Sequence, residues 1–188
     1  MNLQDKPALL LIDIQKGLDQ LAYYGGHRNN PNAEDNMGRL LRFWRDNNLP
    51  LFHIKHNSTN AESPLAKGKP GNDIKDVVKP LAHETVIEKS VNSAFIGTNL
   101  QQQLDAQGIK TLVIVGLTTE HCVSTTTRMA GNLGYETFLV SDATVAFDKI
   151  GPDGKKFSAE IIHETTLASL HQEFATVLET GDLLKQLQ

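Results

Sequence analysis

Short apolar runs alternate with segments of helical periodicity along most of the chain. The runs at residues 8–12 and 111–115 are apolar at nearly every position, which is typical of strands buried on both faces. We predict six strands, at residues 8–12, 50–54, 85–88, 111–115, 137–140 and 174–178. Because strands and helices alternate, the pattern predicts a doubly wound α/β fold with a parallel sheet covered on both faces.

The helical segments are recognised by their apolar stripes and by residues that begin or end a helix. Between residues 34 and 47, Met37, Leu40 and Trp44 fall on one stripe. Further helices are predicted from Thr98 to Gly108, from the segment around residue 122 to Leu133, from 158 to 171, and at the C-terminus. Residues 57–84 lack this pattern and are rich in Ser, Pro, Lys and Gly, so we expect a functional loop or lid there.

Length and composition narrow the class of protein. We expect one domain over residues 1–188, because this length suffices for one substantial core. The 18 basic and 22 acidic side chains form no basic stripe, which argues against nucleic-acid binding. No apolar run is long enough to span a bilayer, and the first residues do not resemble a signal peptide. We therefore expect a cytoplasmic protein that acts on a small molecule and has no membrane partner.

Three polar residues follow strands of the predicted sheet. Asp13 comes directly after the first strand, Lys89 after the third, and Cys122, the only cysteine, after the fourth. In a doubly wound sheet, ligands bind beyond the carboxyl ends of the strands. The three side chains are therefore expected at one edge of the sheet.

This combination of residue types is suited to acyl transfer. A helix start and a nearby cation lower the pKa of a thiol, so we expect Lys89 to favour the Cys122 thiolate. Asp13 could accept the thiol proton, protonate a leaving group and then activate water. Backbone amides between Leu117 and Cys122 could stabilise the oxyanion. No cofactor and no metal are needed for this cycle.

Each of these residues also has an ordinary structural interpretation. A lone cysteine is often a small buried apolar residue. An aspartate after a strand can cap the next loop, and a lysine is usually solvated or paired locally, here with Glu88. Their shared position at one sheet edge favours the catalytic interpretation.

Three motifs carry a resemblance to a known superfamily. They are LLLIDIQKG with Asp13, VIEKSVNSAFIGTNL with Lys89, and VIVGLTTEHCVSTTTRMAGNLGY with Cys122. In this order, they resemble the isochorismatase-like cysteine hydrolases, which include nicotinamidases and other amidohydrolases. The resemblance runs from about residue 8 to residue 177. It implies a Rossmann-like, three-layer αβα sandwich around a six-stranded parallel sheet, with Asp13, Lys89 and Cys122 as the catalytic triad.

The resemblance implies further features of the site. A cis peptide bond is expected between Leu117 and Thr118, with an oxyanion hole formed by the amides of Thr118 and Cys122. Gln15 matches a position that lines or supports the site in relatives, although a loop-capping role is equally compatible with the sequence. The resemblance also implies a homo-oligomer. Since isochorismatases cleave a vinyl ether without a thiol, the presence of Cys122 favours an amide substrate.

Four histidines are candidates for metal ligands, catalytic partners or structural residues. Nicotinamidases carry an Asp-x-His pattern for a divalent metal, but here His53 and His56 stand without an aspartate and point to opposite faces of a strand. We therefore predict no metal site and place His56 in the substrate pocket. His121 is adjacent to Cys122, which is a poor spacing for a dyad, so a structural or interface role is expected. His163 is predicted to pack on a helix.

The remaining assignments concern the walls of the pocket. Phe95 is a candidate for the pocket wall or the core, and Glu120 is interpreted as a residue that stabilises the start of its helix. Arg28 is either solvated or able to reach an anionic substrate.

The predicted function is cysteine-dependent hydrolysis of the C–N bond of a small carboxamide. The alternatives are an inactive binding or assembly module of the same fold and a redox-responsive thiol protein.

Overall fold

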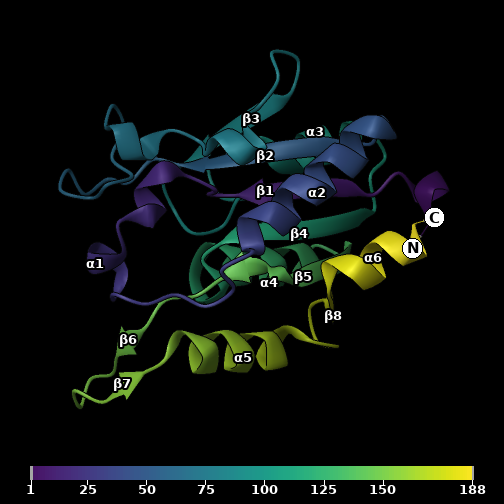
Figure 1. Ribbon diagram of the computed structural model, residues 1–188. Helices are drawn as coiled ribbons and strands as arrows, with labels where there is room; N and C mark the ends of the chain where they lie inside the picture. The colour runs from purple at the N-terminus through teal and green to yellow at the C-terminus, as the bar shows by residue number, and fades with distance from the viewer. Residues whose placement is uncertain (1, 188) are drawn as a thin grey trace.

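The computed structural model describes residues 2–187 and contains the predicted six-stranded parallel sheet. The strand order is β3-β2-β1-β4-β5-β8, and every neighbouring pair is parallel (Figure 1). The strands are β1 (Ala8–Ile12), β2 (Leu51–His56), β3 (Thr85–Lys89), β4 (Thr111–Leu117), β5 (Glu136–Val145) and β8 (Thr176–Leu178). The order reverses between β1 and β4, and the carboxyl ends of these two strands therefore border the crevice in which such folds bind ligands.

Helices cover both faces of this sheet and complete the three layers. The helices are α1 (Leu21–Tyr24), α2 (Ala33–Asp46), α3 (Leu100–Ala106), α4 (Ser124–Asn132), α5 (Ala159–Leu170) and α6 (Thr180–Gln186). Met37 and Trp44 of α2 and Leu183 of α6 pack in one core, in front of the sheet in Figure 1. Leu104 of α3 and Leu170 of α5 pack in the second core on the opposite face. The α/β sandwich predicted from the alternating pattern is confirmed.

The two central strands follow directly from their sequence. All five residues of β1 and all seven of β4 are buried, because each strand is covered by helices on both sides. Side chains alternate between the two cores, with Leu9 and Leu11 in one and Leu10 and Ile12 in the other. Burial on both faces explains why the apolar runs are continuous rather than alternating.

A small hairpin was not predicted from the sequence. It consists of β6 (Lys149–Ile150) and β7 (Lys156–Phe157), which pair in antiparallel fashion outside the main sheet. Figure 1 shows this hairpin at the lower left, directly before α5. Strands of two residues are too short to produce a hydrophobic pattern. The hairpin nevertheless matters, because it brings Lys149 to the site described below.

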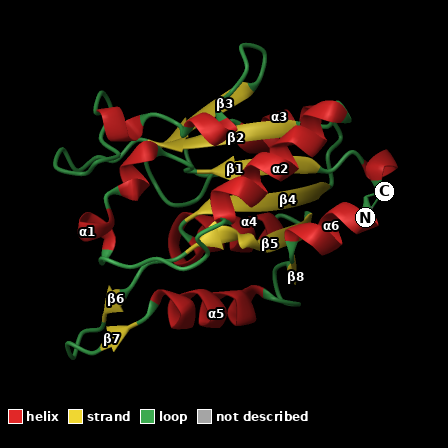
Figure 2. Cartoon of the chain, in the orientation of Figure 1, coloured by secondary structure: helices red, strands yellow, loops and turns green. Residues whose placement is uncertain are grey.

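The segment predicted as a loop or lid is mainly loop in the structure. Figure 2 shows it between β2 and β3, interrupted by two short helical turns, Pro70–Asn72 and Asp76–Val78. The Asn72 side chain is buried and donates hydrogen bonds to the carbonyl oxygens of His56 and Leu65. These bonds fasten the loop to the end of β2.

No helix among residues 2–187 is both long enough and apolar enough to cross a membrane.

Candidate active site

Asp13 leaves the end of β1 with a left-handed backbone, with φ of 51°. Aspartate is one of the few residues besides glycine that adopt this conformation readily. The Asp13 amide donates a hydrogen bond to the carbonyl oxygen of Ile54, which anchors the turn to β2. The Asp13 carboxylate is 2% exposed, so its charge requires a partner inside the protein.

Lys89 supplies that partner from the end of β3. Its Nζ lies 2.7 Å from Oδ2 of Asp13, and the two side chains are 0% and 3% exposed. The same Nζ lies 3.2 Å from Nδ1 of His56 at the end of β2. Burial and the Lys89 ammonium lower the pKa of His56, which favours its neutral form. The parallel register explains the meeting, since His56 and Lys89 are direct neighbours across β2 and β3.

Cys122 lies in a single turn of π-helix, Thr119–Val123, between β4 and α4. The peptide bond between Leu117 and Thr118 is cis, as the resemblance implied. One ligand-type atom of each of Asp13, His56 and Cys122 lies within 4.8 Å of the other two. The Cys122 thiol also donates a weak hydrogen bond of 3.8 Å to Oδ1 of Asn92. The structure therefore brings the three predicted catalytic side chains together at one sheet edge.

Gly116 makes this close approach of β1 and β4 possible. Its φ is +130°, and the register between β4 and β5 shifts between Ile114 and Gly116. A Cβ atom at this position would collide with the carbonyl oxygen of Ile12, the residue before Asp13. Only glycine fits this backbone approach.

The expectation that Cys122 has a lowered pKa is wrong. Burial raises the pKa of the thiol, and the negative charge of Asp13 raises it further, while Lys89 opposes this effect only in part. The main cause is burial, and Lys89 compensates only in part because its ammonium is already paired with Asp13 at 2.7 Å. The thiol is therefore protonated at neutral pH, and a base must remove its proton before or during attack.

A cavity of about 440 Å³ opens beside the thiol. Its lining residues are Asp13, Leu18, Tyr23, Tyr24, His56, Ser63, Leu65, Asn92, Leu117, Thr118, His121, Cys122 and Lys149. The lining includes both residues of the expected oxyanion hole, Thr118 and Cys122. Seven lining side chains had no role in the sequence interpretation, namely Leu18, Tyr23, Tyr24, Ser63, Leu65, Asn92 and Lys149. They lie in loops and short elements, where the sequence has no periodic signal.

Two of the three predicted pocket residues do not line this cavity. Both ends of the Gln15 amide are engaged by the backbone: its Nε2 donates to the carbonyl oxygens of His56 and Asn72, and its Oε1 accepts from the His56 amide. Gln15 thus joins the end of β2 to the loop. Phe95 stacks on Tyr135, with ring centroids 5.9 Å apart, and packs against the core. His56 lines the cavity as expected.

The three other histidines discussed in the sequence analysis occupy three different environments. His53 is buried on the opposite side of β2 from His56, and its Nε2 lies 2.9 Å from Glu84. His163 is buried beside Thr119, with Nδ1 2.9 Å from the threonine hydroxyl, which confirms a packing role. His121 lines the cavity beside the thiol, and its side chain is 55% exposed. His121 therefore lies at the cavity because it is adjacent to Cys122 in sequence, but it is not a partner of the thiol.

Arg28 does not point into the catalytic cavity. Its guanidinium forms two hydrogen bonds with Glu34, of 2.7 and 2.6 Å. Lys75 contacts the same carboxylate at 2.7 Å. Arg28 is thus neutralised within an ion network at the start of α2.

Among residues 2–187, Asp13, His56 and Cys122 form a set that could together hold a metal ion. Carboxylate, imidazole and thiolate are all suitable ligands for zinc. However, the Lys89 ammonium already contacts both Asp13 and His56. A positive side chain in contact with two of the three ligand residues makes the set a poor fit for a divalent cation.

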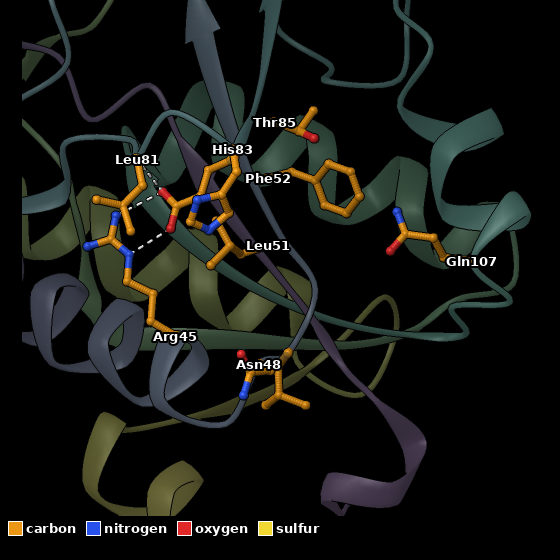
Figure 3. Close-up of a pocket in the computed structure, with 10 residues that line it drawn as sticks. Arg45, Asn48, Leu51, Phe52, Leu81, His83, Thr85 and Gln107 are labelled. Carbon is orange, nitrogen blue, oxygen red and sulfur yellow. Dashed lines mark hydrogen bonds and ion pairs between the residues drawn. The ribbon is translucent and has the colours of Figure 1, made fainter.

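A second cavity of about 440 Å³ lies at the opposite edge of the sheet, where β2 and β3 begin. Figure 3 shows Arg45, Leu81, His83 and Thr85 around it. Arg45 donates to both carboxylate oxygens of Glu84, which also accepts from the Leu81 amide. These contacts join α2 to the start of β3. This ion pair is therefore part of the framework and is remote from the thiol.

Comparisons with known proteins agree with this geometry. A family model described as the isochorismatase domain matches residues 7–182. The chain belongs to the isochorismatase family. The match covers all six strands and all three catalytic candidates, so the predicted resemblance is confirmed. The chain is accordingly a hydrolase of the general type found in this family.

Individual relatives match along nearly their whole length. The isochorismatase family protein YrdC of Bacillus subtilis is 46% identical over 182 residues, which cover 97% of this chain and 96% of YrdC. A crystal structure of an isochorismatase-family protein from Chromobacterium violaceum has a TM-score of 0.93 at 43% identity, covering 97% of this chain and 93% of that one. Nicotinamidase 3 of Arabidopsis thaliana is 27% identical over 193 residues, covering 96% and 88%.

Proposed function

We propose that this protein hydrolyses the C–N bond of a small carboxamide through a thioester on Cys122. The observation that carries this proposal is the arrangement of the Asp13 carboxylate. Its Oδ2 is held by Lys89, whereas its buried Oδ1 has no hydrogen-bond partner among residues 2–187. A carboxylate oxygen of Asp13 and the Cys122 sulfur lie within 4.8 Å. Asp13 is therefore oriented by one oxygen and available for proton transfer through the other.

The first half of the reaction uses Asp13 as base and then as acid. As the Cys122 sulfur bonds to the substrate carbonyl carbon, the thiol proton passes to Asp13. The resulting oxyanion is stabilised by the backbone N–H groups of Thr118 and Cys122. Collapse of this intermediate breaks the C–N bond, and Asp13 returns its proton to the departing nitrogen. Ammonia or an amine leaves, and the acyl group remains on sulfur.

Water completes the reaction. A water molecule gives one proton to Asp13 as its oxygen bonds to the thioester carbon. The C–S bond then breaks, the carboxylic acid is released, and the proton returns from Asp13 to sulfur. Throughout both halves, Lys89 keeps the Asp13 carboxylate in position and reduces the cost of its buried charge.

The raised pKa of the Cys122 thiol agrees with this order of events. A thiol that is protonated at rest needs a base within reach, and the same negative charge of Asp13 that raises the pKa can accept the proton. The name of the Arabidopsis relative, a nicotinamidase, supports an amide as the scissile bond. The cycle uses the chain's own residues and calls for no cofactor.

The test is ammonia release from a panel of small carboxamides, including nicotinamide, by the native protein, by Cys122→Ala and by Cys122→Ser. A parallel series contains EDTA. Ser169→Ala is the control, because Ser169 is exposed on α5 and lies away from the cavity. We expect release that is retained in the control and with EDTA but lost in both Cys122 variants. Release from no amide would contradict the proposal and favour a binding module of the same fold.

A further inference from the structure

The outer part of the catalytic cavity carries an ion pair that takes no part in the proposed hydrolysis. Glu120 lies in the π-helical turn two residues before Cys122, and Lys149 begins the β6–β7 hairpin. Nζ of Lys149 is 3.0 Å from Oε1 of Glu120, and the two side chains are 31% and 11% exposed. Lys149 also lines the cavity. The hairpin therefore places a cation at the cavity, and Glu120 neutralises it.

The charges around the cavity cancel in pairs. Among residues 2–187, the lining contains one carboxylate, that of Asp13, and one ammonium, that of Lys149. Lys89 and Glu120 do not line the cavity but neutralise these two charges: Lys89 pairs with Asp13 at 2.7 Å, and Glu120 pairs with Lys149 at 3.0 Å. Burial lowers the pKa of the lining histidines His56 and His121, which favours their neutral forms. No net charge is thus left for a charged substrate group to neutralise.

The remaining surface of the cavity suits an uncharged, flat or apolar body. Leu18, Tyr23, Tyr24 and Leu65 supply apolar and aromatic walls. Such walls gain from burying apolar substrate surface, while a few polar groups fix the orientation. Asn92 can serve as one of these, because its side chain lies beside the Cys122 sulfur.

We propose that the Glu120–Lys149 pair makes this site select uncharged carboxamides and disfavour those that carry a carboxylate. The inference rests on the proposed amide hydrolysis, because it states which amides the protein hydrolyses. A substrate carboxylate near Lys149 would have to compete with Glu120, which is already 3.0 Å away and is mostly buried. It would also meet the negative charge of Glu120 at close range. Both effects penalise anions, whereas an uncharged amide displaces no ion pair.

The proposal is tested without turnover by alkylating the single cysteine. Iodoacetamide is uncharged and iodoacetate is anionic, and the two reagents have similar size. Their rates with the protein are compared at about pH 8, where histidines are neutral, the more so His56 and His121, whose pKa values burial lowers. Each rate is divided by the rate with free N-acetylcysteine, which removes the intrinsic difference between the reagents. We expect the native protein to favour iodoacetamide by about tenfold or more.

Two variants change this preference in opposite directions. Glu120→Gln frees the Lys149 charge, so the preference for iodoacetamide should fall by about tenfold. Lys149→Met leaves Glu120 negative, so the preference should rise. Lys149 lies on the β6–β7 hairpin outside the main sheet. Lys149→Met therefore still tests the inference if Glu120→Gln fails to fold. Lys155→Met is the matched control, because Lys155 belongs to the same hairpin and has its ammonium over the Phe157 ring.

Equal normalised rates in the native protein would overturn the inference, as would variants that shift the preference no more than Lys155→Met does. Failure of the proposed function is detected separately, by the ammonia assay. A protein that shows the alkylation preference but hydrolyses no amide would contradict amide hydrolysis while charge selection by the cavity stands. Hydrolysis of amides together with equal alkylation rates would support the proposed function and contradict charge selection by the cavity.

Discussion

The ammonium of Lys89 lies 2.7 Å from Oδ2 of Asp13, and neither side chain has appreciable contact with solvent. A buried pair of this kind is costly to break, because each charge depends on the other for stabilisation. Together with burial, it also affects the protonation state of the Cys122 thiol. Burial and the Asp13 charge raise the pKa of this thiol, and in the proposed mechanism it keeps its proton until a substrate carbonyl is present.

Replacing Lys89 tests the cost of this burial. We predict that Lys89→Met lowers the free energy of unfolding by about 3 to 5 kcal/mol, because it leaves the Asp13 carboxylate buried without its cation. Lys67→Met is the matched control: Lys67 pairs with Glu88 at 3.0 Å, but its side chain is 73% exposed. The control should lose less than about 1 kcal/mol. Urea unfolding measures both, and equal losses would contradict this account of the pair.

Replacing Asp13 tests proton transfer. The asparagine introduced by Asp13→Asn tolerates the left-handed backbone and keeps an oxygen that can accept from Lys89. We predict that Asp13→Asn lowers kcat/KM for an active amide by about a thousandfold. Thermal unfolding should show that the variant is folded. A loss smaller than about tenfold would show that another group moves the proton.

Gly116 is predicted to tolerate no side chain. In Gly116→Ala, the new Cβ would collide with the carbonyl oxygen of Ile12 and the residue would keep an unfavourable positive φ. We expect a loss of about 3 kcal/mol or more, or failure to fold. Gly154→Ala is the control, because Gly154 also has a positive φ, of 81°, but a Cβ there meets no described atom within 4 Å. It should lose only about 1 kcal/mol. Similar losses in both variants would show that backbone conformation alone accounts for the effect.

Glu84 provides a prediction of pH dependence. Burial alone would raise the pKa of Glu84, but hydrogen bonds from Arg45, from the Leu81 amide and from His53 lower it to about 2. A carboxylate with a lowered pKa stabilises the fold above its ordinary pKa of about 4.3, and this stabilisation disappears as the pH falls towards 2.

We therefore expect Glu84→Gln to be less stable than the native protein by about 3 kcal/mol at neutral pH, with a difference that shrinks below about pH 4. Urea unfolding at several pH values measures this. Glu173→Gln, at an exposed position, is the control and should differ little from the native protein at any pH. A difference between Glu84→Gln and native protein that stays constant down to about pH 2 would contradict the assigned pKa.

The sequence predicted the central elements because their burial leaves a strong pattern. The apolar run at 8–12 is β1 without change, and the run at 111–115 is β4 except for its last two residues. β5 continues past its apolar part to Val145, since Ser141 and Asp142 interrupt the pattern but not the strand. Residues at the ends of such strands can be placed from topology alone, which is how Asp13, Lys89 and Cys122 were found.

The walls of the cavity could not be predicted in this way. Tyr23, Tyr24 and Lys149 come from short elements whose positions depend on tertiary contacts. Phe95 packs against the core instead, where it stacks on Tyr135. The protonation state of the Cys122 thiol could not be predicted from the sequence either. The sequence predicts that Lys89 lies near Cys122, but it does not show that the Lys89 ammonium is already paired with Asp13.

The most direct test of the central claim is mass spectrometry of the protein quenched in acid during turnover of an active amide. We predict that the peptide containing Cys122 gains the mass of the substrate's acyl group, and that hydroxylamine removes this added mass. Cys122→Ala should show neither the adduct nor ammonia release. Ammonia release that continues in Cys122→Ala, with no adduct on Cys122 in the native protein, would contradict covalent catalysis by this thiol.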